Sequence, residues 1–150
     1  TSSAASDVYK RQHLNGSRFT LLLFVTVWMA DSAAYFVGNA FGRTKMIESI
    51  SPKKTIEGFI GGYIGSLLCV FIFTHFELLK YSLTTLQIIL LSISIGIFGQ
   101  LGDFFESMIK RNYKIKDSSN LLLGHGGFLD RFDSIIISSP LIFIFLRFIS

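Results

Sequence analysis

Four long apolar runs dominate the hydrophobic pattern of the chain. They cover about residues 19–41, 59–79, 83–105 and 128–149. A membrane helix rises about 1.5 Å per residue and needs about 20 residues to cross the hydrocarbon core. Because the backbone finds no water partners in lipid, each run predicts a helix. We therefore expect an all-α integral membrane protein, a polytopic bundle of about four transmembrane helices.

The polar segments between these runs carry much of the positive charge. Residues 42–58 contain Arg43, Lys45, Lys53 and Lys54, and residues 106–127 contain Lys110, Arg111, Lys114 and Lys116. Two crossings separate these segments, so both should lie on one side of the membrane. The positive-inside rule places that side in the cytoplasm.

Residues 1–17 form a polar tail without a clear helical or strand period. We expect this tail to be flexible, and either it is not the native lead-in to the first run or preceding spans are missing. Residues 18–150 would then be the membrane-embedded portion of a larger protein.

The composition agrees with a membrane protein. Half of the residues are hydrophobic and 16% are charged, whereas ordinary soluble domains have about 25% charged residues. So few polar residues exclude intrinsic disorder, and a single cysteine excludes a disulfide scaffold. The net charge of +4 does not indicate a nucleic-acid partner, because most phenylalanines lie inside the apolar runs.

A carboxylate lies in the middle of the first run. Asp31 shares a predicted helical face with Ala34, Tyr35 and Gly38. On insertion scales, a carboxylate at the bilayer centre costs about 2.5–3.5 kcal/mol. Asp31 is therefore a candidate for a polar site, and a structural hydrogen bond to a neighbouring helix is the alternative.

Glycines recur at helical spacing where the second run begins: Gly58, Gly61, Gly62 and Gly65. A phosphate-binding loop would follow a strand and continue with Gly-Lys-Ser or Gly-Lys-Thr, and neither feature is present. The spacing instead predicts a stripe for close helix packing.

Oxygen-bearing side chains gather at two predicted helix ends. The third run ends with Gln100, Asp103, Glu106 and Ser107 at helical spacings, and the fourth begins near Asp130 and Asp133. Neighbouring carboxylates repel unless a cation lies between them, and Mg²⁺ prefers such oxygens. The alternative is that Glu106 ends a span and that an Asp caps a helix.

A glycine-rich turn, two carboxylate groups and two basic segments suit a phosphorylated substrate with bound Mg²⁺. Gly124, Gly126 and Gly127 would let backbone amides approach a phosphate. Nucleotidyl and phosphoryl transfer depend on positioning and charge neutralisation. At the membrane boundary, a lipid phosphate could meet a water-soluble nucleotide.

The segment from Ser107 to Asp133, with its Lys-Arg, Lys-Asp, His-Gly-Gly and Asp-Arg-x-Asp elements, closely resembles the signature of the phosphatidate cytidylyltransferase (CDP-diacylglycerol synthase) family. The segments WMADSAAYFVGNAFGR, SPKKTIEGFIGG and QLGDFFES resemble that family too. The similarity covers about residues 21–150. Leu123 departs from the family, which usually has Pro or Gly there, and family members have additional spans before the first run. The resemblance thus identifies residues 18–150 as a C-terminal catalytic portion.

The resemblance implies the reaction and its participants. CTP and phosphatidate would give CDP-diacylglycerol and diphosphate in phospholipid biosynthesis, with Mg²⁺ and a second, monovalent cation, K⁺. It implies a multi-pass protein of the bacterial inner membrane, in contact with membrane lipids, with its site at the cytoplasmic ends of the helices. A homodimer is expected as well.

The resemblance also assigns roles to residues. Asp103 and Asp130 would hold the metal ions, and Asp117 and Asp133 would orient cationic groups or complete the metal shell. Phosphate charge would be neutralised by Lys110, Arg111, Lys116 and Arg131. His125 would donate to a phosphate oxygen, or is simply a positioned polar residue. The substrate-binding candidates are Asp31, Ser51, Lys53, Lys54, Thr55, Ser107, Gly126 and Gly127.

Three other functions stay open at this point. A CTP-dependent polyprenol or dolichol kinase, or an ether-lipid cytidylyltransferase, would have similar chemistry. A transporter could use Asp31, Asp103 and Asp130 to line an ion path. The chain could also be a structural piece that is inactive alone.

Overall fold

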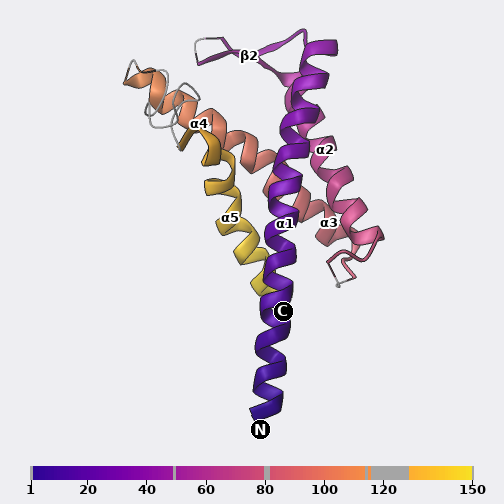
Figure 1. Cartoon of the computed structure of the whole chain (residues 1–150). Coiled ribbons are helices and arrows are strands. Elements are labelled where there is room, and N and C mark those ends of the chain that lie inside the picture. Colours follow the sequence, from indigo (N-terminus) through magenta and orange to yellow (C-terminus); the bar gives the residue numbers. More distant parts are fainter. Residues whose placement is uncertain (1, 49, 80–81, 114, 116–128, 150) are drawn as a thin grey trace.

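The computed structural model describes residues 2–48, 50–79, 82–113, 115 and 129–149, and most of them are helical (Figure 1). The helices are α1 (Ser2–Phe41), α2 (Ile56–His75), α3 (Thr85–Ser92), the π-helical turn η1 (Ile93–Ile97), α4 (Phe98–Asn112) and α5 (Leu129–Ile149). Within the described residues, three helical segments are long and apolar enough to cross a membrane: Gly16–Phe41, Ile56–His75 and Thr85–Asn112. Asp133–Phe145 is a shorter apolar helix. The predicted polytopic helical bundle is confirmed.

The backbone of the polar tail is helical. Helix α1 begins at Ser2, so residues 2–17 continue the first span without a break. Extending an existing helix adds one hydrogen bond per residue without a new nucleation step. A helical period in the tail's own sequence is therefore not needed for it to be helical.

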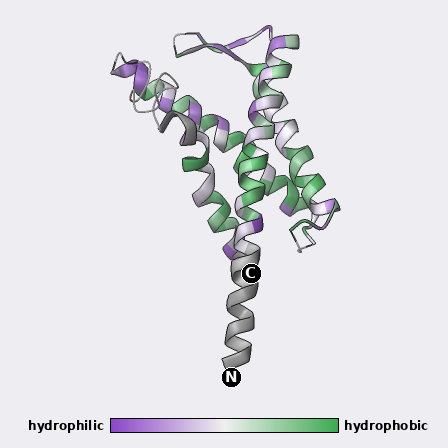
Figure 2. Cartoon of the chain, in the orientation of Figure 1, coloured by the Kyte–Doolittle hydropathy of each residue, from purple (hydrophilic) through white to green (hydrophobic). Residues whose placement is uncertain are grey.

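A short β-hairpin is added to the helical bundle. Strands β1 (Lys45–Ile47) and β2 (Ser51–Thr55) are antiparallel, with Lys45 opposite Thr55 and Ile47 opposite Ser51. The hairpin lies at the same end of the bundle as the end of α4, and the turn after α2 lies at the opposite end (Figure 1). Figure 2 shows hydrophilic residues at the hairpin and at that end of α4, with apolar helices between the two ends. The described part of the second basic segment, which includes Lys110 and Arg111, therefore lies at the same end as the first basic segment.

Glycines let α2 pack closely against two neighbours. A side chain at Gly58, Gly61 or Gly65 would collide with α1, where Ala34, Val37 and Ala33 lie. Gly62 faces the other way, and a Cβ there would lie 2.6 Å from Nε2 of Gln100 in α4. The predicted packing stripe is confirmed, and it serves two interfaces.

Gly61→Ala is expected to destabilise the protein by about 1–3 kcal/mol, the usual cost of overpacking. The new Cβ would lie 2.6 Å from Cβ of Val37, a β-branched residue with few alternative rotamers. Thermal unfolding in detergent should show a melting temperature lower by several degrees. Gly16→Ala is the matched control, because nothing lies within 4 Å of its Cβ position. Equal melting temperatures for the two variants would contradict the packing.

The π-helical turn is a meeting point of three helices. The Phe98 amide donates to the Ile93 carbonyl, five residues earlier, which widens the helix. Ser66 of α2 donates to the Ser92 carbonyl at 3.1 Å, and Ser138 of α5 donates to the Ile95 carbonyl at 3.4 Å. These bonds connect α2 and α5 to the third span.

The apolar core fills the half of the bundle remote from the hairpin. It includes Leu22 of α1, Val70 of α2, Leu91 of α3 and Ile142 of α5, all buried. Towards the hairpin, small and polar residues replace these large side chains. The bundle is therefore tightly packed at one end and hollow at the other.

Candidate active site

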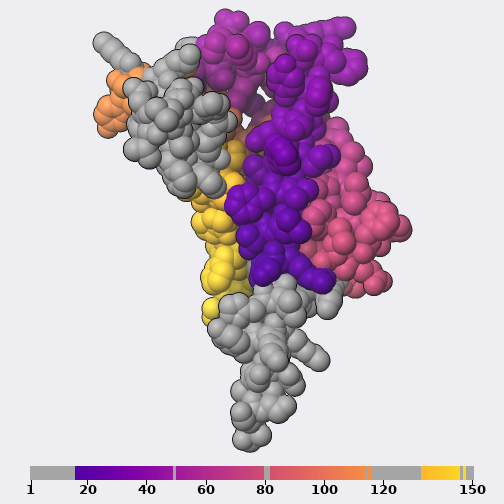
Figure 3. Space-filling view, in the orientation of Figure 1, coloured from indigo at the N-terminus to yellow at the C-terminus, as the bar shows by residue number. Residues whose placement is uncertain are grey.

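A cavity of about 690 Å³ opens at the hairpin end of the bundle, between α1, the hairpin, α2 and α4. In Figure 3 a hollow separates the hairpin from the upper part of α1. Its charged lining residues are Asp31, Lys45, Lys53, Lys54 and Asp103, and its aromatic ones are Tyr35, Phe59 and Phe104. The cavity thus combines both signs of charge with apolar surface.

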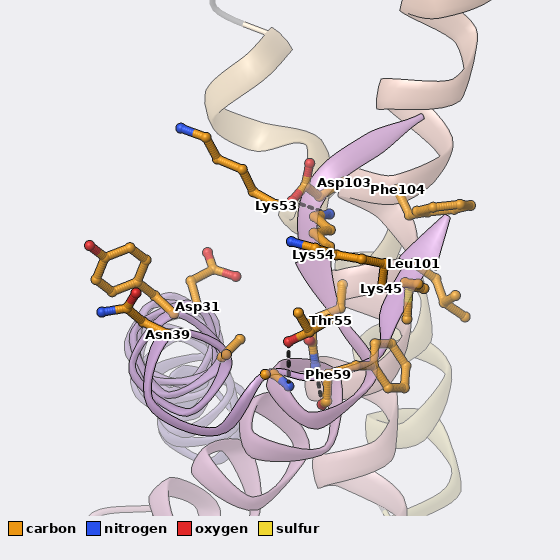
Figure 4. A pocket seen from close by; sticks show the side chains of 17 residues that line it. Asp31, Asn39, Lys45, Lys53, Lys54, Thr55, Phe59, Leu101, Asp103 and Phe104 are labelled. Carbon is orange, nitrogen blue, oxygen red and sulfur yellow. Dashed lines mark hydrogen bonds and ion pairs between the residues drawn. The ribbon is translucent and has the colours of Figure 1, made fainter. Parts of the chain in front are cut away.

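One face of α1 forms the first wall. The predicted face of Asp31 lines the cavity together with Ala34, Tyr35 and Gly38, and Asn39 and Gly42 extend it. Figure 4 shows the Asp31 carboxylate pointing from α1 towards the side where the hairpin lysines and Asp103 lie. Asp31 interacts electrostatically with Asp103, Asp133 and Lys54. Asp31 therefore belongs to a polar site.

The hairpin forms the second wall and is fastened at its base and its tip. At the base, both carboxylate oxygens of Glu57 accept from the Thr44 amide, at 3.1 and 3.2 Å. Thr55 accepts from the Gly58 amide at 3.1 Å and so caps α2. At the tip, Arg111 of α4 donates from Nε to the Ile50 carbonyl at 3.3 Å. These bonds hold β2 over the cavity.

An ion pair crosses the cavity from the hairpin to α4. Nζ of Lys54 lies 2.6 Å from Oδ2 of Asp103, and the two side chains are 30% and 37% exposed. Figure 4 shows the contact as a dashed line, with Lys53 directed away from it. Two residues that the sequence placed in separate segments are therefore partners.

Further carboxylates lie beside this pair. The Asp133 carboxylate interacts with those of Asp103 and Glu106, and Ser107 donates to Oδ1 of Asp103 at 3.5 Å. Such carboxylates repel one another unless a cation or proton lies among them, so the donor chemistry fits a hard cation. Within the described residues, no three Asp, Glu, His or Cys side chains are arranged as a complete metal site.

Three other predicted residues lie outside the cavity lining. Lys110 is paired with Glu106 on the same helix, at 3.3 Å. Arg111 contacts the tip of the hairpin, and Ser51 lies at the start of β2. The structure brings Asp31, Lys53, Lys54, Thr55 and Asp103 to the lining of one cavity, and these three residues are not part of that lining.

The remaining predicted residues cannot be placed in the cavity. Lys116, Asp117, His125, Gly126 and Gly127 lie outside the described residues. Asp130 and Arg131 belong to the first turn of α5, as predicted, but their side chains lie outside the described part. Their roles stay predictions.

Some lining residues had no predicted role. Asn39 lies eight residues after Asp31, so helical spacing alone could have identified it. Lys45, Phe59 and Phe104 give no such signal, because they reach the cavity only through the hairpin and the packing of α2 against α4.

The fold and the cavity define a class of protein: a polytopic membrane protein with a charged cavity at one end of its helices. Residues 3–149 match the cytidylyltransferase family, and the chain belongs to that family.

Curated relatives of this chain are phosphatidate cytidylyltransferases. The one from Bacillus subtilis is 42% identical over 136 residues, 90% of this chain and 49% of the relative. The one from Staphylococcus haemolyticus is 45% identical over 132 residues, 88% and 50% of the two chains. The one from Haemophilus influenzae is 43% identical over 143 residues, 94% and 50%. The chain thus spans about half the length of the curated relatives it matches.

Proposed function

We propose that this chain is the catalytic part of a phosphatidate cytidylyltransferase. The enzyme would join CTP and phosphatidate to give CDP-diacylglycerol and diphosphate in phospholipid biosynthesis. The observation that carries the proposal is the Lys54–Asp103 pair inside the cavity. Lys54 supplies a positive charge for phosphate, and Asp103 supplies a carboxylate for a metal ion. The relatives of the chain are named for this reaction.

The reaction requires one bond to form and one to break. An oxygen of the phosphatidate phosphate attacks the α-phosphorus of CTP. The bond between that phosphorus and the oxygen bridging to the β-phosphorus breaks, and this oxygen leaves with diphosphate. Such transfers need no covalent nucleophile. Lys45, Lys53 and Lys54, which line the cavity, neutralise phosphate charge in this scheme.

Mg²⁺, with K⁺ beside it, is the proposed cofactor, and Asp103 and Asp130 are its proposed ligands. The closeness of Asp103, Glu106 and Asp133 supports this assignment, because crowded carboxylates favour a bound cation. When bound, Mg²⁺ would neutralise charge on the reacting phosphates. Asp31 contributes negative charge to the same cavity.

We further propose that the cavity faces the cytoplasm at the bacterial inner membrane. Arg43, Lys45 and Lys110 belong to the two basic segments, and the described parts of both segments lie at the cavity end. CTP would enter from the aqueous side and phosphatidate from the bilayer. Contact with membrane lipids and a homodimer belong to the same proposal.

A product assay tests this function. The complete polypeptide containing this chain, in detergent with Mg²⁺, CTP labelled at the α-phosphate and phosphatidate, is expected to form labelled CDP-diacylglycerol and one diphosphate per lipid product. Addition of EDTA should stop turnover. Release of CDP with phosphorylation of a polyprenol would instead indicate a kinase. Ion uptake into proteoliposomes without CTP would indicate a transporter.

A further inference from the structure

Gln100 of α4 lines the cavity with its amide held in one orientation. Its Nε2 donates to the Gly96 carbonyl at 2.9 Å and to the Phe59 carbonyl of α2 at 3.2 Å. Both N–H groups are therefore used. The reversed amide would place its oxygen against two carbonyl oxygens, so the chemistry of these contacts excludes it.

The oxygen of this amide is left as an acceptor. Within the described part of the chain, no hydrogen bond to Oε1 of Gln100 is found, and the residue is partly exposed and lines the cavity. The amide fits beside Gly62 because this residue has no side chain. A Cβ at Gly62 would lie 2.8 Å from Oε1 of Gln100. The cavity therefore contains a fixed acceptor that a ligand can reach.

The surroundings of Gln100 suit a flat, uncharged group. Phe59, Leu101 and Phe104 line the cavity with it, whereas the lysines come from the hairpin. Removing a triphosphate from water costs much free energy, so the phosphates favour the lysines. Removing a nucleobase from water costs less free energy. Asp103 lies three residues beyond Gln100, a helical rise of about 4.5 Å. Base and phosphates would thus occupy successive levels of the cavity.

We propose that Gln100 distinguishes cytosine from uracil, an inference that rests on the proposed use of CTP. Cytosine presents an exocyclic amine where uracil presents a carbonyl. A fixed acceptor pairs with the amine and repels the carbonyl. Because the two bonds from Nε2 prevent the amide from turning over, Gln100 cannot become a donor to uracil.

The test is a cycle that removes each partner of the hydrogen bond. The complete protein, either unchanged or carrying Gln100→Met, is assayed with three nucleotides. These are CTP, UTP and a cytidine triphosphate analogue that lacks the exocyclic amine. The unchanged enzyme should prefer CTP to both other nucleotides by about tenfold to a hundredfold in kcat/KM, typical of losing a buried hydrogen bond. Gln100→Met should reduce this preference to within about threefold.

Each ratio compares kcat/KM for two nucleotides on one preparation. Partial unfolding of a variant lowers both values equally and so cancels from the ratio. Ser66→Ala is the matched control, because Ser66 also bonds to the third span but does not line the cavity. It should keep the full preference for CTP. Full preference in Gln100→Met, or equal use of CTP and the analogue by the unchanged enzyme, would overturn the inference.

Direct binding separates this inference from the proposed function. If the unchanged protein forms no CDP-diacylglycerol, the proposed function fails, and equilibrium binding of CTP and UTP then reports on Gln100 without turnover. Preferential binding of CTP that Gln100→Met abolishes would support the inference. Equal binding of the two nucleotides would reject it.

Discussion

Replacing Asp103 with Asn is expected to lower the turnover of CTP by about 10²–10³-fold, the loss typical when one preorganised electrostatic group is removed. The substitution keeps the shape of the side chain and removes its charge. It deprives the proposed cation of a ligand and Lys54 of its partner at 2.6 Å. Initial rates at several Mg²⁺ concentrations should show that more Mg²⁺ is required.

The loss should not arise from unfolding. About a third of each side chain in the Lys54–Asp103 pair is exposed, so its contribution to stability is small. The melting temperature in detergent should change little. Glu48→Gln, which removes an exposed carboxylate from the hairpin turn, is the matched control and should retain activity. Turnover by Asp103→Asn close to that of the control would refute the role of Asp103.

Lys54→Gln should be far more damaging than Lys53→Gln. The two lysines are neighbours on β2 and both line the cavity, but Lys54 is half-buried and contacts Asp103. We expect a loss of about 10²-fold in kcat/KM for Lys54→Gln, because it removes a positioned charge from the proposed site of cytidylyl transfer. Lys53→Gln should cost only a few-fold, since its exposed charge is screened by solvent.

Steady-state kinetics with varied CTP and varied phosphatidate measure both effects. Lys54→Arg, which keeps the charge, should recover part of the lost activity. Because an arginine fork has a different geometry, recovery should be incomplete. The expectation fails if Lys53→Gln is the more severe variant, or if Lys54→Gln leaves both substrate dependences unchanged.

The spans and their packing were predictable because their signals are local. A run of about 20 apolar residues has few alternatives in a membrane. The glycines at positions 58, 61, 62 and 65 follow the helical period, so their role in packing was visible. The sequence could not show that Gly62 faces Gln100 while the other three face α1, since this depends on where the neighbouring helices lie.

The hairpin and the π-helical turn left no usable pattern. Strands β1 and β2 have three and five residues, too few for an alternation to stand out. The turn at Ile93–Ile97 adds one residue to a helix whose flanks are equally apolar, so the hydrophobic period hardly changes. The turn is contacted by Ser66 and Ser138, which are 26 and 43 residues from their acceptors and so leave no local signal.

For the site, helical spacing predicted which residues share a helix face, but not which faces meet in the folded chain. Helical spacing grouped Asp31 with Tyr35, and Asp103 with Gln100, each on its own helix. That the two faces line one cavity, with Lys54 paired to Asp103, follows from the tertiary packing. The same packing brings Arg111 to the tip of the hairpin, a contact that the sequence did not predict.

The polar contacts at the π-helical turn set an order on assembly in the bilayer. Helices enter the membrane in the order of synthesis and associate afterwards. The bond from Ser138 to Ile95, and the packing of Gly99 and Gly102 against α5, can form only after residues 129–149 have been inserted. Until then the third span keeps a bare glycine face. A nascent chain interrupted before α5 would therefore expose a surface that membrane quality-control proteases could recognise.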